Sequence, residues 1–284
     1  MAAATYRKWE ETMQSLIRVD ANKCTRCGLC VNDCPYVVLR LDPEKGPVAA
    51  RDACVSCGHC VSICPTGAMD NINSPLAAQK PLAGTPPKAD ELEYLFQSRR
   101  SSRWFEDRPV PGALTMRLLE AGRRAPSGSN SQGVCYIVIE NPETLRRISA
   151  TVIDWGKSAL EDDLPINFLM YGLIERYAQG LDSILFNAPS LIVTVGSARE
   201  SFKRVRENSI FSLFQVQLMA ETLGLGSCWA GVLEGCAFAG CLPLLRLLDI
   251  PEGMTFTGAL ALGYPRHRHQ RIPERNPLQV VWKK

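Results

Sequence analysis

Eight of the twelve cysteines stand in two runs that share one spacing. Each run has the form C-x2-C-x2-C-x3-C, and a proline, Pro35 or Pro65, follows directly. A cubane iron–sulfur cluster needs four thiolates, and three cysteines separated by two residues let one turn of backbone reach three of its corners. The spacing therefore predicts two [4Fe-4S] clusters. Their expected ligands are Cys24, Cys27, Cys30 and Cys34 from the first run and Cys54, Cys57, Cys60 and Cys64 from the second.

The last cysteine of each run is expected to cross to the other cluster. It lies too far along the chain to close on the cluster of its own run, and the proline after it fixes φ and stops a continuing helix. We therefore expect Cys64 to join the first three cysteines of the first run, and Cys34 to join Cys54, Cys57 and Cys60. The segment that carries the two runs is too short to bury much apolar surface. We therefore expect the clusters to act as its core.

Zinc and disulfides are the alternatives for these cysteines. Structural zinc usually takes two well-separated C-x2-C pairs rather than three close cysteines and a fourth. Disulfides would need a secreted context, and residues 1–20 contain no apolar signal-peptide core. We expect reduced thiolates and oxygen-sensitive clusters in the cytoplasm of an anaerobe.

Composition limits the class of partner. The chain is 46% hydrophobic and 21% charged, which is ordinary for a globular protein, and no apolar run reaches membrane-spanning length. A net charge of +3 without aromatic-interleaved basic patches does not indicate nucleic-acid binding. We therefore expect neither a membrane segment nor a nucleic-acid partner.

Three regions are predicted along the chain. Residues 1–69 form an N-terminal helix, over Thr5–Ile17, and the cluster domain. Residues 70–89 contain four prolines among small and polar residues and are predicted to be a linker. Residues 90–284 alternate helical and strand patterns, and their four scattered cysteines are expected to be structural.

The third region has clear element patterns. A helix is predicted from Asp90 or Glu91, and buried strands are predicted over Tyr136–Ile139, Leu191–Val195 and Thr257–Leu262. Residues 210–223 are apolar almost all round, which predicts a helix buried against a core or a partner subunit.

A short basic segment follows the first helix of this region. Residues 99–103 read RRSSR and offer guanidinium and hydroxyl groups, which suit a phosphate. A solvated basic loop is the alternative for this segment taken alone.

Three further segments accompany the basic one in a fixed order. They are APSGSNSQ at 125–132, GLGSCWAG at 224–231 and IPEGMTFTGALALGYP at 250–265, with Arg271 and Arg275 beyond. With RRSSRWF they make residues 90–284 resemble the FMN-dependent nitroreductase family, while the N-terminal part resembles a bacterial two-cluster ferredoxin. The resemblance implies an α+β flavin domain, with a mostly antiparallel sheet surrounded by helices.

The resemblance also implies FMN-binding residues. Arg99, Ser101 and Arg103, with Arg100 beside them, match the residues that hold the phosphate and neighbouring flavin atoms. Ser127, Asn130 and Gln132 belong to a loop that meets the polar edge of the flavin, partly from the partner subunit. The remaining matches are Gly226, Ser227 and Trp229 near the ring, and Arg271 and Arg275, which return to the phosphate.

The chain departs from the family in places. Gly133 and Val134 stand where many members have Pro-Trp, which changes the pocket wall. Residues 152–188 match no motif, so Tyr171, Arg176 and Tyr177 are either substrate-pocket residues or ordinary helix-face residues. No catalytic side chain is assigned, because His59, His267 and His269 stand in no recognisable catalytic arrangement.

The expected function is reduction of a small electron-poor acceptor, with electrons that a donor such as ferredoxin delivers through the clusters to FMN. Two alternatives stay open: a redox sensor or electron carrier without small-molecule turnover, and a reductase driven directly by NAD(P)H. The resemblance implies a homodimer. The apolar helix from Ile210 and the segment Leu278–Trp282, as a strand on the other subunit, would fit it.

Overall fold

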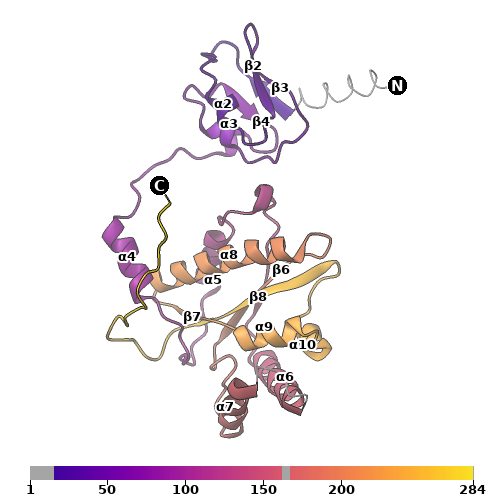
Figure 1. The fold of residues 1–284 in the computed structure, drawn as a ribbon, viewed down its shortest axis with the longest axis vertical. Helices are drawn as coiled ribbons and strands as arrows, with labels where there is room; N and C mark the ends of the chain where they lie inside the picture. The colour runs from indigo at the N-terminus through magenta and orange to yellow at the C-terminus, as the bar shows by residue number, and fades with distance from the viewer. Residues whose placement is uncertain (1–15, 162–166, 284) are drawn as a thin grey trace. The chain divides into compact units, whose positions relative to one another are not determined.

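The structure is a computed structural model that describes residues 16–161 and 167–283. Most of the helix predicted over Thr5–Ile17 lies outside the described residues, and Ile17 itself begins a strand. The described chain divides into two compact units (Figure 1). The first ends at Pro86 and includes Ser129–Ser131, and the second comprises Pro87–Gly128 and the chain from Gln132 onward.

The first unit is built from two small antiparallel strand pairs and two one-turn helices. Strand β1 (Ile17–Val19) pairs with β4 (Met69–Asn71), and β2 (Leu39–Asp42) pairs with β3 (Gly46–Ala49). The helices are α2 (Leu29–Asn32) and α3 (His59–Ser62), and the 3-10 helix η1 (Leu76–Ala78) follows β4 in the stretch predicted to be a linker.

The two cysteine runs have the same backbone conformation. Gly28 and Gly58 precede α2 and α3 with φ of 77° and 76°, a left-handed conformation that glycine adopts without steric cost. Arg26 and Ser56, two residues earlier, also have positive φ, 55° and 53°. Each run therefore wraps its first three cysteines into the same turn.

The second unit is centred on a four-stranded antiparallel sheet with the order β5-β6-β8-β7. The strands are β5 (Cys135–Ile139), β6 (Ser190–Ser197), β7 (Gly226–Trp229) and β8 (Met254–Gly263). The helices are α4 (Ala89–Ser98), α5 (Gly112–Gly122), α6 (Pro142–Glu161), α7 (Asn167–Ala178), α8 (Phe202–Thr222), α9 (Gly231–Phe238) and α10 (Leu242–Leu247).

Helices cover both faces of this sheet (Figure 1). On one face Leu118 of α5 and Leu213 of α8 pack on Ile192 of β6. On the other face Ile148 of α6 and Leu233 of α9 share a core cluster with Leu191 and Val193, the residues of β6 on either side of Ile192. Because both faces are buried, β6 and β8 are almost continuously apolar. The α+β architecture expected from the sequence is confirmed.

The predicted strands of this unit are confirmed: β5 begins one residue earlier than predicted, and β6 and β8 are longer at both ends. Helix α8 begins eight residues before the predicted Ile210, and its apolar surface is only partly buried. Leu213 is fully buried, whereas Ile210, Phe211 and Phe214 are 39%, 52% and 44% exposed in the single chain. Residues 278–282 form no strand, and Leu278 and Trp282 are largely exposed. Among residues 16–161 and 167–283, no helix is long and apolar enough to span a membrane.

Candidate cofactor sites

Four cysteines line each of two cavities in the first unit. Cys24, Cys27, Cys30 and Cys64 line one cavity, called here the first cysteine site. Cys34, Cys54, Cys57 and Cys60 line the other, the second cysteine site. Each site takes three cysteines from one run and the last cysteine from the other run. The cavities enclose about 360 Å³ and 390 Å³ of empty space.

The thiols of each site act on one another. Burial, followed by the neighbouring Cys64 and Cys27, raises the pKa of Cys30. Burial, followed by Cys54 and Cys57, raises the pKa of Cys60 to about 11. Buried thiols that would repel one another as thiolates are stabilised by a bound cation, because metal ligation requires the deprotonated form.

The arrangement fits a cluster better than a single metal ion. Within the described ranges, no three His, Cys, Asp or Glu side chains converge closely enough to hold one ion. A tetrahedral zinc site would bring four sulfurs to about 2.3 Å from a single centre. A cubane places its thiolates on four separate irons and so needs cysteines set around a larger space.

In the second unit, residues 99–105 run alongside strand β7. Ser101 forms a parallel bridge with Ser227, and the Ser102 N–H donates to the Ser227 carbonyl at 2.9 Å. Phe105 forms a further bridge with Pro265. This extended backbone places alternate side chains on opposite sides of the segment.

Arg99, Ser101 and Arg103 act together on the buried thiol of Cys228. Burial raises the pKa of Cys228, and the Arg103 charge, a hydrogen bond with the Ser101 side chain and the Arg99 charge oppose that rise. Two guanidinium charges and a hydroxyl of this segment therefore act at the Cys228 position of β7. This donor set fits a phosphate or another anion.

Arg100 and Ser102 line a different cavity. It holds about 780 Å³ of space, and Glu221, His267, Arg268 and His269 also line it. The buried Nε of Arg100 has no hydrogen-bond partner. Burial raises the pKa of Glu221, and the charge of Arg99, a hydrogen bond from the Arg100 backbone and the charge of Arg100 oppose the rise. Arg99 therefore acts both on Cys228 and on Glu221, which lines the cavity that Arg100 lines.

The loop predicted to meet the flavin edge is fixed by α8. Asn208 accepts a hydrogen bond from the Gly128 N–H at 3.0 Å, and Arg204 donates to the Gly128 carbonyl at 2.5 Å. The Gln132 N–H donates to Ser127 Oγ at 3.0 Å, and both residues line a cavity with Arg123 and Arg124. Asn130 belongs to the three residues grouped with the first unit.

Of the remaining predicted residues, Gly226 and Ser227 lie beside the basic segment. Gly226 and Ser227 are buried in β7, and Gln217 donates to Ser227 Oγ at 3.4 Å. Trp229 lies 5.4 Å from the guanidinium carbon of Arg206. Arg271 and Arg275 are exposed in the irregular C-terminal segment, and Arg268 lines the Arg100 cavity in their place.

The candidate pocket residues of 152–188 are also separated. Tyr171 is 62% exposed, Arg176 lies 5.7 Å from the ring centre of Trp104, and Tyr177 packs against the core.

Sequence reasoning missed a buried ion pair between α8 and α9. Arg206 Nη2 lies 2.7 Å from Glu234 Oε2, and Glu234 is 5% exposed. The residues are 28 positions apart and resemble ordinary helix-face residues, so no local pattern identifies them.

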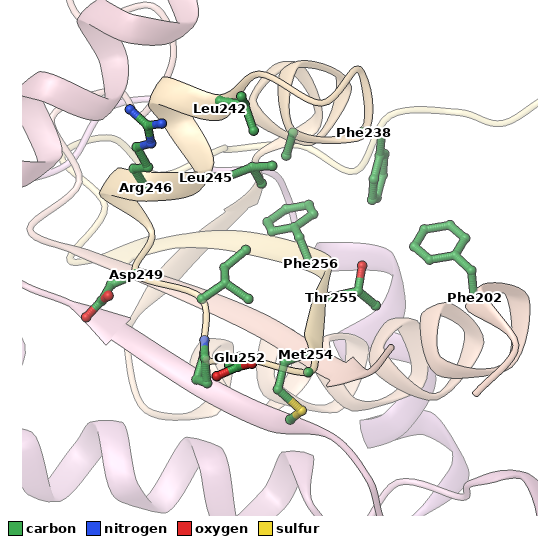
Figure 2. Close-up of a pocket in the computed structure, with 14 residues that line it drawn as sticks. Phe202, Phe238, Leu242, Leu245, Arg246, Asp249, Glu252, Met254, Thr255 and Phe256 are labelled. Atoms are coloured by element: carbon green, nitrogen blue, oxygen red, sulfur yellow. The ribbon is translucent and has the colours of Figure 1, made fainter. Parts of the chain in front are cut away.

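A wide cavity near this ion pair was also not predicted. It holds about 1440 Å³ of open space between α9, α10 and the start of β8. Figure 2 shows Phe238 and Phe256 in its wall beside Phe202, with Arg246, Asp249 and Glu252 farther round. None of the predicted cofactor-binding residues lines it.

Comparisons with known proteins match both units. Residues 96–264 match the model of the nitroreductase family, and residues 23–69 match that of the 4Fe-4S dicluster domain. An NADH dehydrogenase of Thermus thermophilus is 27% identical over 65% of this chain and 92% of its own length. The NAD(P)H-dependent FMN reductase of Bacillus subtilis is 26% identical over 68% and 72%. A Desulfitobacterium hafniense nitroreductase, solved with bound FMN, has a similar fold, with a TM-score of 0.57 and 22% identity over 69% of this chain and 100% of that one.

Proposed function

The chain belongs to the nitroreductase family and is therefore an oxidoreductase, and we propose that it carries electrons from a donor, a small ferredoxin, through two [4Fe-4S] clusters to FMN and on to an electron-poor organic acceptor. Nitroaromatics, quinones and activated alkenes are the acceptor classes. Bound clusters supply one-electron steps, and bound FMN supplies two-electron chemistry.

One observation carries the proposal: in a chain of this family, four cysteines surround each of two cavities. The cysteines of the first and second sites would each hold one cluster. Because Cys27 is exposed, its thiolate would be open to oxidation. This supports our placement of the protein in the cytoplasm of an anaerobe.

We assign FMN binding to the second unit. Arg99, Ser101 and Arg103 would hold the phosphate, and the backbone of Gly226 and Ser227 would lie near the ring, with Trp229 at the end of the strand. The loop with Ser127 and Gln132 of this unit, and with Asn130 between them, would meet the polar edge of the flavin, partly from the partner subunit. Arg271 and Arg275 would reach the phosphate only after the C-terminal segment folds back, and Arg100 has the weakest case because it lines another cavity.

We also propose that the protein is a homodimer. The exposed side chains of Ile210, Phe211 and Phe214 give α8 an apolar face that a second copy would cover. The exposed apolar residues of 278–282 offer a further segment for the partner subunit.

The electron path is tested by removing one cysteine of the second site. Cys57→Ser should abolish the bleaching of bound FMN by reduced ferredoxin, because one cluster loses a ligand. The matched control is Cys135→Ser, since Cys135 is exposed and lines neither cysteine site. Unchanged ferredoxin-driven bleaching in Cys57→Ser would contradict the path. Photoreduction of the flavin should remain in both variants and shows that the second unit is intact.

The names of the relatives favour a second candidate, direct reduction by NAD(P)H. Rapid mixing of the protein with NADH or NADPH distinguishes the two. Fast bleaching that persists in Cys57→Ser favours the nicotinamide donor, and the absence of bleaching favours ferredoxin.

A further inference from the structure

The two cysteine sites receive different hydrogen bonds at sulfur. Ala68 and Val38 stand at equivalent positions, four residues after the last cysteine of each run. Their N–H groups donate to Cys64 Sγ at 3.2 Å and to Cys34 Sγ at 3.4 Å. At the second site Cys54 Sγ also accepts hydrogen bonds from the Ser56 N–H at 3.4 Å and from the side-chain Nδ2 of Asn71 at 3.7 Å. In the part of the chain that the structure describes, this is the one side-chain amide that donates to a cysteine sulfur.

The strand pair β1–β4 supplies residues to both sites but gives each a different chemistry. Val19 is paired with Met69, and both line the first site. Ile17 is paired with Asn71, and both line the second site. One ladder therefore presents two apolar side chains to the first site and an apolar side chain with an amide to the second.

The amide of Asn71 is held in one orientation. Asn71 is 1% exposed, and a buried amide is costly unless its groups are hydrogen-bonded. Its Oδ1 accepts the N–H of Asn73 at 3.0 Å, which fixes the amide so that Nδ2 points to Cys54. The donor at the sulfur is therefore set by the turn after β4.

We propose that Asn71 tunes the second cysteine site by raising the reduction potential of the cluster held there. This rests on the proposed function, since it requires a cluster at each site. Reduction adds a negative charge to a cluster and its thiolates, and a donor at a thiolate stabilises that charge. Hydrogen bonds to sulfur and solvent exposure are the means by which a protein sets cluster potentials.

The cysteines of the two sites differ in their solvent exposure. Cys27 of the first site is exposed, so water can donate to that sulfur, whereas each cysteine of the second site is partly buried. At the first site the side-chain partner at sulfur is the Thr66 hydroxyl, 3.8 Å from Cys64 Sγ, whereas at the second site it is the buried amide of Asn71.

The test is a redox titration of the reconstituted full chain under anaerobic conditions, followed by electron paramagnetic resonance. Asn71→Ser keeps a hydroxyl that can accept the Asn73 N–H but is too short to reach the sulfur. One of the two midpoint potentials should fall while the other stays unchanged. Asn71→Leu, which lacks any donor, should lower the same potential and is the second variant if the first assembles poorly.

Asn73→Ala is the matched control. Its side chain donates to Ser56 Oγ at 3.0 Å rather than to a sulfur, so its removal should leave both potentials closer to wild type than Asn71→Ser does. Two unchanged potentials in the Asn71 variants at full iron content, or an equal fall in both, would overturn the proposal.

The titration distinguishes a failure of the Asn71 proposal from a failure of the proposed electron path. If both clusters titrate and Asn71→Ser shifts only one, yet ferredoxin does not reduce the flavin, the tuning stands and the electron path does not. A wild-type chain that takes up no cluster overturns both.

Discussion

Gly226 is the residue that allows residues 99–103 to approach β7. A Cβ at this position would lie 2.2 Å from Ser102 Oγ, 2.8 Å from Ser102 Cβ and 3.2 Å from Pro265 Cβ. Side chains cannot approach this closely, so either the segment or the strand would have to move. The absence of a side chain at Gly226 thus helps to hold Arg99, Ser101 and Arg103 beside Cys228.

Gly226→Ala should destabilise the second unit by about 1–3 kcal/mol, the usual cost of overpacking. Ser102→Gly in the same chain should recover part of the loss, because it removes the two nearest atoms. The control is Gly172→Ala, since a Cβ there would meet nothing within 4 Å. Thermal unfolding followed by circular dichroism measures all three. If Gly226→Ala melts with the wild type, the packing argument is wrong.

The ion pair between Arg206 and Glu234 joins three elements where β7 ends. Trp229 is the last residue of β7 paired with β8, and beyond it Glu234 Oε1 accepts the N–H of Ala259 at 3.0 Å. Arg206 also donates to the carbonyl of Thr257. The two side chains therefore supply hydrogen bonds to backbone groups of β8, the Ala259 N–H and the Thr257 carbonyl, where β7 has ended.

Glu234→Ala should destabilise the second unit by about 3–5 kcal/mol, because it leaves Arg206 partly buried without its carboxylate. Arg206→Met combined with Glu234→Leu should recover most of this loss, since a well-packed apolar pair can replace a buried ion pair. Glu120→Ala breaks an exposed pair with Arg123 and should cost less than about 1 kcal/mol. Equal melting temperatures for Glu234→Ala and Glu120→Ala would contradict this account.

Sequence patterns predict a helix or strand well where its burial comes from apolar side chains of the segment itself. The strands β6 and β8 are buried along most of their length and mostly apolar because helices cover both faces, so their existence is evident from the sequence. The first turns of α8 do not continue the apolar pattern because they contain Lys203, Arg204 and Arg206. Of these, Arg206 is held partly buried by the carboxylate of Glu234, 28 residues away. Tertiary pairing of this kind leaves no periodic pattern.

The cluster cysteines are easier to predict from the sequence than the flavin-binding residues. Cysteine spacing is a local property, and the structure sets four cysteines around each cavity. The flavin residues come from distant segments: Arg99 acts at Cys228, Ser127 lines a cavity with Arg123 and Arg124, and Arg275 is exposed. The contact of Asn71 with Cys54 likewise depends on the folded turn after β4, so no local sequence pattern predicts it.

The chain folds into two compact units, and the proposed function assigns a different kind of cofactor to each. The cysteine sites lie in the first unit, and the proposed phosphate-binding side chains lie in the second. Loading of one unit should therefore leave the ligands of the other unchanged.

The most direct test is to count iron and flavin per chain after anaerobic reconstitution. The account predicts about eight irons and about one FMN per chain. Arg99→Ala combined with Arg103→Ala should keep the iron and lose much of the flavin, because the phosphate loses two cationic partners. A wild-type chain that holds only about four irons, or that holds its iron but no FMN, would contradict the central claim.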